Sequence, residues 1–331
     1  MFDIRLTGGK FQDNTFDVII IGGGPAGLSA AIYSGRARLK TLLIESMAVG
    51  GQITLTEYIE NYPGFEKPIL GQELAEKMEK QARRFGVEIR YAEATSVSLK
   101  DDEKRVYLSG EGNGHLKSKV VMLALGTNPR KLGVPGEEEF TGRGVSYCAP
   151  CDAPLFKDKH VIVVGGGDTA VEESLFLTKF AKKVSIVHRR NKLRAIPILQ
   201  ERVANNPKID FIFDSVVRKI RGDAKVESAT IENLKDGKDE ELKCDGVFIF
   251  VGLEPQTALV KNEVKCDEKG FIVTNEDMET NIKGVYAIGD VRVKSLRQVV
   301  TAVSDGAIAA MAAYKYVAED TEFKSALQNL R

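Results

Sequence analysis

The sequence predicts an α/β fold with two Rossmann-like dinucleotide-binding domains, each built from three layers, two of strands and one of helices. Two glycine-rich motifs predict it: Gly22–Gly27 follows the apolar run Phe16–Ile21, and Gly165–Ala170 follows His160–Val164. Continuous apolar runs of this kind are typical of parallel strands that are buried on both faces. Because the same pattern occurs twice, we expect one architecture used in both halves of the chain.

Each motif opens a β-α-β unit, which is about 30 residues long in known folds. After the first motif we expect a helix from Leu28 to about Ala37 and a strand over Lys40–Glu45. After the second we expect a helix over Val171–Ala181 and a strand over Lys183–His188. Each copy therefore has the strand, turn, helix and second strand that a dinucleotide site requires.

Two Gly-x-x-Pro turns indicate where the chain passes between the domains. They follow the predicted strands Val120–Gly126 and Val247–Gly252. We expect a short N-terminal extension over residues 1–15, an outer domain over 16–127 and 255–331, and an inserted domain over 128–254. A rotation about the two crossings would let different groups of the inserted domain reach the same place in turn.

Composition narrows the class of protein. The chain has 331 residues, with 47 basic and 47 acidic side chains. Zero net charge argues against general binding to nucleic acid or to an anionic membrane, since both need a basic excess. The sequence shows neither a signal-like apolar segment ahead of Phe16 nor a run long enough to span a bilayer. We therefore expect a cytoplasmic protein.

The first motif has the Gly-x-Gly-x-x-Gly spacing of a dinucleotide site. The first glycine permits a tight turn, the second lets a pyrophosphate approach the backbone, and the third lets the helix pack on the strand. Glu45 ends the strand that follows the helix, where it can accept from ribose hydroxyls. The predicted contacts are Gly22, Gly24, Pro25, Ala26, Gly27 and Glu45. They fit an unphosphorylated dinucleotide, either FAD or NAD.

The second motif has basic residues where the first has an acid. The strand over Lys183–His188 runs directly into two arginines, and Arg194 follows closely. Guanidinium groups pair with phosphate in bidentate geometry, so this cluster favours NADPH, whose ribose bears a 2′-phosphate. The alternative is a solvated basic stretch. The predicted NADPH contacts are Gly165, Gly167, Asp168, Thr169, Ala170, His188, Arg189, Arg190 and Arg194.

A third segment favours FAD over NAD at the first site. Asn281–Val291 reads as a short apolar strand that ends in Gly289-Asp290. A carboxylate at the end of a strand can accept from the ribityl hydroxyls of a flavin. Arg297 and Gln298 then open a predicted helix that runs to about Glu319. The positive end of that helix would stabilise the charge of a reduced flavin.

The chain has four cysteines, and two of them form the motif Cys148-Ala149-Pro150-Cys151. Zinc would need four ligands, usually a second pair, whereas Cys244 and Cys266 stand alone. An inert structural pair is a second reading. We favour a redox-active dithiol, because this spacing permits a disulfide and lowers the pKa of one thiol. Asp152 adjoins it and could move the proton that exchange requires. Cys244 and Cys266 read as small core residues.

Taken together, these motifs resemble the low-molecular-weight, bacterial-type thioredoxin reductases. The matching segments lie in that family's order from Phe16 to about Val317: GGGPAG, GGQI, ENYPG, CAPCD, GGGDTAVEE, HRRNKLRA, AIGDV and RQ. The resemblance implies an FAD- and NADPH-dependent homodimer that reduces thioredoxin. The chain departs from the family at Pro150 and Ala153, where Thr and Gly are common. The larger reductases carry a cysteine pair after the second strand of the FAD unit, and this chain has none there.

The resemblance also assigns roles to individual residues. Cys151 would face the flavin, Cys148 would attack the thioredoxin disulfide, and Asp152 would be the proton donor. Further residues would contact or lie close to the flavin, namely Gly51, Gln52, Asn61, Gly126, Gly289, Asp290, Arg297 and Gln298. The three arginines of the basic cluster would hold the 2′-phosphate.

The resulting expectation is a thioredoxin reductase in which NADPH reduces FAD, FAD reduces the Cys148–Cys151 disulfide, and the dithiol reduces thioredoxin. The alternative is a related flavin disulfide reductase with another donor, ferredoxin or NADH, or with another protein disulfide as substrate. A non-enzymatic flavin- or zinc-binding regulator is a more distant alternative.

Overall fold

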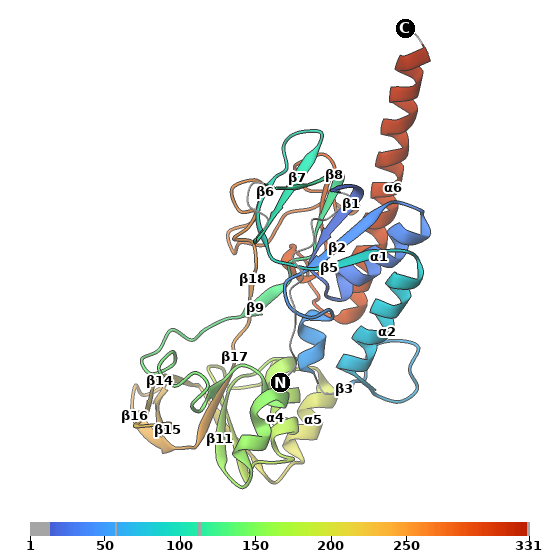
Figure 1. The fold of residues 1–331 in the computed structure, drawn as a ribbon. Helices are drawn as coiled ribbons and strands as arrows, with labels where there is room; N and C mark the ends of the chain where they lie inside the picture. The colour runs from blue at the N-terminus through green and yellow to red at the C-terminus, as the bar shows by residue number, and fades with distance from the viewer. Residues whose placement is uncertain (1–13, 57, 111–113, 330–331) are drawn as a thin grey trace. The chain divides into compact units, whose positions relative to one another are not determined.

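The computed structural model describes residues 14–56, 58–110 and 114–329, except for the side chains of residues 320–329. It divides into two compact units. Asn128–Glu254 forms one, the inserted unit, and the chain on either side of it forms the other, the outer unit (Figure 1). The predicted N-terminal extension lies outside the described residues up to residue 13, and Thr15 already belongs to the first strand.

The outer unit is built on a seven-stranded sheet with the order β5-β2-β1-β8-β7-β6, in which β19 also pairs with β8. Strands β1, β2, β5, β8 and β19 are parallel, whereas β6 and β7 form an antiparallel hairpin beside β8. The strands are β1 (Thr15–Ile21), β2 (Thr41–Glu45), β5 (Glu88–Tyr91), β6 (Ala94–Ser98), β7 (Lys104–Leu108), β8 (Leu116–Leu123) and β19 (Val285–Ala287).

Side chains of β1 alternate between two cores, which explains its continuous apolar run. Val18 and Ile20 face the core that contains the helices, whereas Ile19 and Ile21 face a second core with β7 and the segment 260–272. Both faces are thus buried, as the sequence predicts. The helices are α1 (Pro25–Arg36), α2 (Gly71–Arg84) and α6 (Val299–Asn329), and α1 packs closely against α6. The last helix is longer than predicted.

The inserted unit repeats this layering, as predicted. A five-stranded parallel sheet with the order β10-β17-β11-β12-β13 carries helices on one face and a three-stranded antiparallel sheet on the other. The first sheet contains β10 (Val145–Ser146), β11 (His160–Gly165), β12 (Lys183–His188), β13 (Ile209–Phe213) and β17 (Gly246–Phe250). The second contains β14 (Ser215–Gly222), β15 (Val226–Asn233) and β16 (Asp239–Lys243). The helices are α3 (Ala149–Asp152), α4 (Asp168–Leu177) and α5 (Pro197–Ala204).

The two segments that connect the units pair with each other. They form a small two-stranded sheet of β9 (Thr127–Pro129) and β18 (Leu253–Pro255), where the sequence predicted only turns. Short elements complete the fold: β3 (Tyr58–Ile59), β4 (Ile69–Leu70) and the 3₁₀ turns η1 (Gly51–Leu55), η2 (Ala153–Phe156) and η3 (Gly289–Val291).

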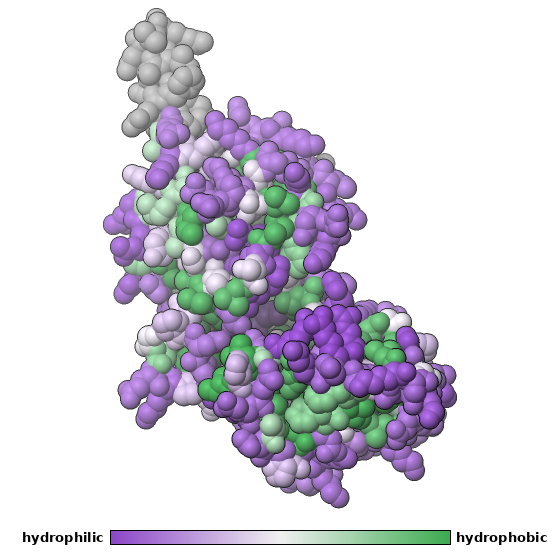
Figure 2. All heavy atoms as spheres, turned by 180° about the vertical axis from the view of Figure 1, so that it is seen from behind, coloured by the Kyte–Doolittle hydropathy of each residue, from purple (hydrophilic) through white to green (hydrophobic). Residues whose placement is uncertain are grey.

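Hydrophilic residues predominate on the face shown in Figure 2, and hydrophobic ones form scattered patches there. Among the described helices, none combines the length and the apolar character that crossing a membrane would need.

Candidate functional site: two glycine loops and a disulfide

The three glycines of the first motif differ in the space around them in the turn between β1 and α1. Gly22 has φ +109°, and a Cβ there would lie 2.2 Å from the carbonyl oxygen of Ala124. A Cβ on Gly27 would lie 1.9 Å from the carbonyl oxygen of Gly22. At Gly24, by contrast, a Cβ would meet no described heavy atom within 4 Å. The loop is therefore closed at its first and third glycines and open at the second, where a pyrophosphate would approach.

The N-terminus of α1 is available to an anion. Pro25 is at the first position of the helix, Ala26 follows it, and no described side chain caps the first turn. The free N–H groups and the positive end of the helix dipole would favour phosphate there.

Glu45 fixes the glycine loop as well as ending β2. Its Oε2 accepts the N–H of Gly23 at 2.7 Å, and its Oε1 accepts the N–H of Met47 at 3.0 Å. The N–H of Gly50 donates to the carbonyl of Gly23 at 2.7 Å. The carboxylate thus joins the two turns that would flank a ribose, and its predicted role at ribose hydroxyls stays a proposal.

Asp290, in η3 just after β19, is a half-buried acid with one unsatisfied oxygen. Its Oδ1 is buried and has no hydrogen-bond partner among the described residues. Burial raises the pKa of its carboxyl, while Lys294 and Arg297 oppose that rise. An unpaired buried carboxyl oxygen costs free energy unless a donor arrives. The ribityl hydroxyls of a flavin are such donors.

The guanidinium of Arg297 makes hydrogen bonds to the backbone of the turn. Its guanidinium donates to the carbonyls of Asp290, Lys294 and Arg292 at 3.3–3.4 Å, and it stacks 4.1 Å from the centre of the Phe271 ring. The side chain that the sequence assigned to the flavin therefore shapes the segment that carries Asp290.

Asp305 on α6 contacts the turn that carries Asp290, and the sequence patterns did not predict it. Its Oδ2 accepts the N–H of Gly289 at 3.0 Å and the Nζ of Lys294 at 2.8 Å, and its Oδ1 lies 3.3 Å from Arg292. The side chains of Lys294 and Asp305 are each 7 % exposed. This network fixes the turn from the helix side. No local signal in the sequence reveals it, because the partners belong to a different element.

Among the remaining residues predicted at the flavin, Gln52, Asn61 and Gln298 make side-chain hydrogen bonds. The Nε2 of Gln52 donates to the backbone carbonyl of Thr127. The Nδ2 of Asn61 donates to the Oε1 of Gln298 at 3.0 Å, although the two lie far apart in the sequence. Gly51 opens η1 beside Gly24, and Gly126 follows β8 with φ +68°. These contacts lie within the outer unit.

The second glycine loop has the same form. A Cβ at Gly165 would lie 2.5 Å from the carbonyl oxygen of Phe250, whereas one at Gly167 would meet nothing within 4 Å among the described residues. Ala170 occupies the third position and is buried. No described side chain caps α4, and the exposed Thr169 lies in its first turn. The loop again leaves space at its middle glycine.

Two hydrogen bonds connect the basic loop to this glycine loop. The backbone N–H of Arg194 donates to the carbonyl of Gly166 at 2.6 Å, and that of Ile196 donates to Oδ1 of Asp168 at 2.8 Å. Arg189, Arg190 and Arg194 are exposed. The structure thus brings the arginines beside the second glycine motif, while the Asp168 carboxylate fixes the loop.

His188 differs from the arginines that follow it. The residue is 4 % exposed, and a Cβ on Gly166 would lie 2.5 Å from its ring. Burial lowers the pKa of the imidazole, and the charges of Arg194, Arg190 and Arg189 lower it further. The buried His188 ring therefore packs against the glycine loop, in surroundings that disfavour a positive charge on it.

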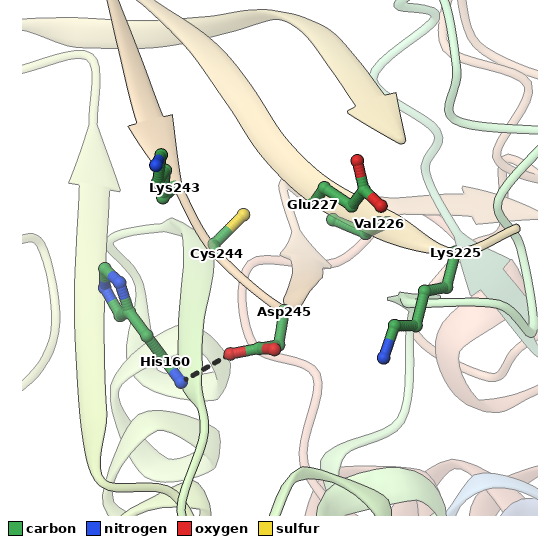
Figure 3. Close-up of a pocket in the computed structure, with 7 residues that line it drawn as sticks. All are labelled: His160, Lys225, Val226, Glu227, Lys243, Cys244 and Asp245. Atoms are coloured by element: carbon green, nitrogen blue, oxygen red, sulfur yellow. Dashed lines mark hydrogen bonds between the residues drawn. The ribbon is translucent and has the colours of Figure 1, made fainter. Parts of the chain in front are cut away.

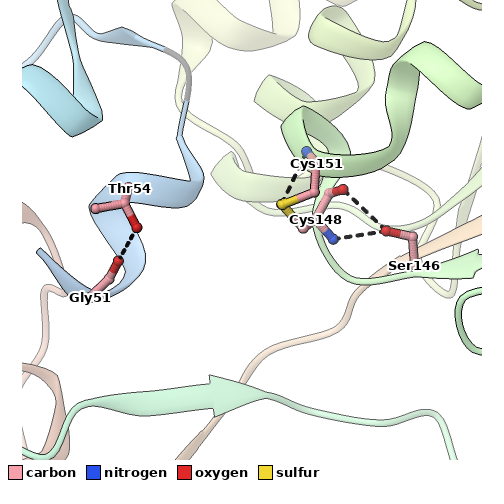
Figure 4. Close-up of a disulfide and its surroundings, with 5 residues drawn as sticks. All are labelled: Gly51, Thr54, Ser146, Cys148 and Cys151. Carbon is pink, nitrogen blue, oxygen red and sulfur yellow. Dashed lines mark hydrogen bonds between the residues drawn. A yellow bond between two sulfur atoms is a disulfide. The ribbon is translucent and has the colours of Figure 1, made fainter. Parts of the chain in front are cut away.

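Cys148 and Cys151 form a disulfide with their Cα atoms 5.4 Å apart (Figure 4). Cys148 caps α3, where its Sγ accepts the N–H of Cys151 at 3.3 Å. The Oγ of Ser146 accepts the N–H of Cys148 and donates to its carbonyl, both at 3.1 Å. Asp152 ends α3 directly after Cys151.

Glu137 stabilises the segment before the disulfide, and the sequence patterns did not predict it. This buried carboxylate accepts the N–H groups of Leu132 and Gly133 at 2.8 and 2.6 Å, and the hydroxyl of Tyr147 at 2.7 Å. Burial, and then Glu137, raises the pKa of Tyr147. The residue next to Cys148 is therefore held in place as a neutral phenol.

The other two cysteines lie apart from the disulfide, as predicted. Cys244 is 4 % exposed at a recess of about 390 Å³ that none of the predicted site residues lines (Figure 3). Burial raises the pKa of its thiol to about 12, so it stays protonated. Cys266 is half-buried against the second core of the outer unit. Within the described ranges, no three His, Cys, Asp or Glu residues gather as a metal site would require.

These features fit two cofactors. The open Gly24, the uncapped α1 and the unsatisfied Asp290 fit a flavin dinucleotide in the outer unit. The open Gly167, the uncapped α4 and the adjacent arginines fit a phosphorylated nicotinamide dinucleotide in the inserted unit.

Comparisons with known proteins place this site in a class. The family model described as pyridine nucleotide-disulphide oxidoreductase matches residues 16–306. The chain therefore belongs to the pyridine nucleotide-disulphide oxidoreductase family. Membership implies a flavin and a pyridine nucleotide, and it confirms the prediction of a flavoprotein disulfide oxidoreductase.

The resemblance read from the motifs is confirmed as well. The chain is 50 % identical over 317 residues to a thioredoxin reductase of Peptoclostridium acidaminophilum, covering 94 % of this chain and all of that one. It is similar to the crystal structure of Lactococcus lactis thioredoxin reductase, with a TM-score of 0.89, 47 % identity, and coverage of 92 % and 99 %. A ferredoxin–flavin thioredoxin reductase from Clostridium acetobutylicum matches with a TM-score of 0.50, 32 % identity, and coverage of 92 % and 99 %.

Proposed function

We propose that the protein is a thioredoxin reductase that takes electrons from NADPH, uses FAD, and delivers them to thioredoxin through Cys148 and Cys151. The observation that carries the proposal is a disulfide in a short helix of a unit that also has a glycine loop lined by arginines. When bound, the flavin supplies the two-electron relay between the nicotinamide and the disulfide.

The arginines favour NADPH as the donor. Arg189, Arg190 and Arg194 are exposed beside the second glycine motif, and arginine suits a 2′-phosphate. Ferredoxin, the donor in the name of the Clostridium acetobutylicum reductase, would not need this cluster. The basic loop therefore supports the pyridine nucleotide, and NADPH over NADH.

Asp290 and the first glycine motif bind FAD in this proposal. Asp290 would accept from the ribityl chain, Gly24 would admit the pyrophosphate, and Glu45 would accept from the adenosine ribose. Asp305, Arg297 and Lys294 hold the turn that carries Asp290. Asn61 and Gln298, which bond each other, would be near the cofactor.

Cys148 is the nucleophile toward thioredoxin in this proposal. Its Sγ already accepts the N–H of Cys151 at the start of α3, and such a hydrogen bond stabilises a thiolate. Attack on the thioredoxin disulfide forms a mixed disulfide and releases a thioredoxin thiolate, which takes a proton from Asp152. The Cys151 thiol then returns a proton to Asp152, and its thiolate attacks the Cys148 sulfur and restores the disulfide. The second thioredoxin sulfur leaves as a thiolate, which takes a proton from water and completes reduced thioredoxin.

Covalent trapping tests these roles. Cys151→Ser cannot resolve the mixed disulfide, so it should accumulate a covalent complex with bacterial thioredoxin through Cys148. Cys148→Ser should accumulate none, and Cys266→Ser serves as the matched control that turns over normally. Trapping through Cys151 in the Cys148→Ser variant would reverse the assignment.

We also infer a homodimer in the cytoplasm. The support is the family resemblance. Size-exclusion chromatography with light scattering tests the dimer directly, and a monomer at micromolar concentration would contradict it.

A further inference from the structure

A glutamate on the neighbouring helix contacts the backbone beside the disulfide. Glu173 on α4 accepts a hydrogen bond from the N–H of Ala149, the first residue of α3. The two helices pack against each other, and Ala149 is buried in the same core as Val171 of α4. The carboxyl group is therefore anchored to the residue that directly follows Cys148.

The second oxygen of this carboxyl has no partner. Glu173 Oε2 is buried and makes no hydrogen bond with any residue that the structure describes. Burial, and then the charge of the adjacent Glu172, raises the pKa of Glu173 to about 8. At neutral pH the surroundings therefore favour the neutral form of this carboxyl group.

Few charges act on this carboxyl. Helix α4 packs against α3, α5, β11, β12 and β17, and β17 has no titratable residue. Glu172 is the one whose charge acts on Glu173. The titratable groups on α4 and on the four other elements are Asp168, Glu172, Asp152, Glu201, Arg202, His160, Lys183 and His188. Reduction of the disulfide would add a negative charge on Cys148, the residue directly before Ala149 in the chain.

We propose that Glu173 is a positioning residue for the Cys148–Cys151 couple: it holds the backbone of α3 and takes up a proton when the disulfide is reduced. This inference rests on the proposed function, since that activity supplies the electrons. Glu173 acts through the Ala149 backbone and through its charge, without touching the reacting sulfur atoms.

The proton balance follows from the fate of the two sulfurs. Breaking the S–S bond takes two electrons from the reduced flavin, and it yields two thiols if two protons arrive on sulfur. If Cys148 stays a thiolate, held by the N–H of Cys151, only one proton ends on sulfur. The negative sulfur then favours the neutral form of Glu173, because like charges repel. The fraction of Glu173 that was ionised takes up the second proton from water.

The test is the pH dependence of the disulfide–dithiol equilibrium in the holoenzyme. Wild type, Glu173→Gln and the control Glu201→Gln are equilibrated with reduced and oxidised dithiothreitol from pH 6.5 to 9.5, and the thiols are counted after alkylation. Glu201 is exposed on α5, which makes it a matched substitution. Glutamine keeps an acceptor for the Ala149 N–H but cannot ionise.

Above about pH 8, the dithiol-to-disulfide ratio of wild type should fall more steeply than that of Glu173→Gln. Uptake of one additional proton changes the dithiol-to-disulfide ratio by up to about a further tenfold per pH unit. This holds between the pKa of Glu173 in the oxidised protein and its pKa in the reduced protein. The dithiol-to-disulfide ratio of wild type, divided by that of Glu173→Gln, should therefore change about threefold or more between pH 6.5 and pH 9.5. The ratio of Glu201→Gln should follow that of wild type. A purely structural role would displace the Glu173→Gln curve without changing its slope, and parallel curves would overturn the proposal.

A second measurement needs no variant. In protein labelled with carbon-13 at glutamate carboxyls, one resonance should titrate near pH 8 in the oxidised form, and its midpoint should rise after reduction with dithiothreitol. An unchanged midpoint would also overturn the proposal. Neither measurement uses NADPH or thioredoxin, so failure of the proposed function would appear separately, as a flavin that NADPH does not reduce.

Discussion

The Oδ2 atom of Asp305 accepts the backbone N–H of Gly289 at 3.0 Å, and the same oxygen lies 2.8 Å from Nζ of Lys294. A residue of the last helix thus fixes the turn that presents Asp290. Because both charged side chains are nearly buried, the interaction is poorly screened by solvent. The geometry of the proposed flavin site therefore depends on an ion pair outside it.

Asp305→Asn should destabilise the protein and weaken flavin retention together. The substitution leaves Lys294 as a buried cation without its anionic partner, which costs about 3 kcal/mol. Thermal unfolding and the flavin-to-protein absorbance ratio measure the two effects. The exposed Asp277→Asn is the matched control, and a variant with normal stability and full flavin content would contradict this role for Asp305.

Asp290→Ala should weaken flavin binding at least tenfold. A hydrogen bond to an ionised group contributes about 1.5–3 kcal/mol, and Oδ1 has no competing partner in the described residues. The stability of the fold should fall far less than in Asp305→Asn. Fluorescence of released flavin during dialysis gives the affinity, and unchanged retention would exclude a contact between Asp290 and the cofactor.

Two glycines of one motif should respond in opposite ways to alanine. Gly24 has φ −70° and open space around a Cβ, so the fold should tolerate Gly24→Ala within about 0.5 kcal/mol while the methyl group blocks the pyrophosphate. Gly27→Ala forces a Cβ to 1.9 Å from the carbonyl oxygen of Gly22 and should cost about 1–3 kcal/mol or more. Denaturant unfolding with flavin content separates the two, and equal destabilisation would refute the distinction.

Arg190→Ala and Arg194→Ala should each raise KM for NADPH by roughly 10- to 100-fold, the loss of one charge-assisted contact. The KM for NADH should change little, because NADH lacks the 2′-phosphate. Lys192→Ala, on the same exposed loop, is the control. Steady-state kinetics with both nucleotides decides the matter, and equal effects on the two would mean that the loop does not read the phosphate.

Protonation of Glu173 should also appear in stability. A carboxyl whose pKa is raised in the folded state to about 8 binds its proton more tightly when folded than when unfolded. Its contribution is complete below the unfolded pKa and is lost as the pH rises toward about 8. The melting temperature of Glu173→Gln should therefore rise relative to that of wild type as the pH is raised from 5 to 9. A constant difference in melting temperature over that range would contradict the raised pKa.

Local pattern was enough to predict the two glycine loops, the parallel strands and the cysteine pair. The glycine spacing is a property of one turn. The continuous apolar residues of β1 reflect burial of both faces of the sheet. Both are fixed within a short stretch of sequence. The arrangement of strands, helices and antiparallel hairpin around each parallel sheet follows from the same repeat.

Residues that act through distant partners could not be predicted in this way. Asp305, Glu173 and Glu137 reach backbone N–H groups that another segment supplies, so their own neighbours in sequence give no sign of the contact. Nor did the local sequence indicate that tertiary packing directs the Arg297 guanidinium to backbone carbonyls and buries the His188 imidazole. The predicted roles of both residues at a cofactor stay proposals.

The central claim is that electrons pass from NADPH through the flavin and the Cys148–Cys151 pair to thioredoxin. Anaerobic titration of the flavin absorbance with NADPH, followed by oxidised thioredoxin, tests it most directly. We expect NADPH to bleach the flavin and thioredoxin to restore its colour in wild type. In a Cys148→Ser/Cys151→Ser variant, NADPH should still bleach the flavin but thioredoxin should not restore it. A flavin that reduced ferredoxin bleaches and NADPH leaves oxidised would contradict the claim.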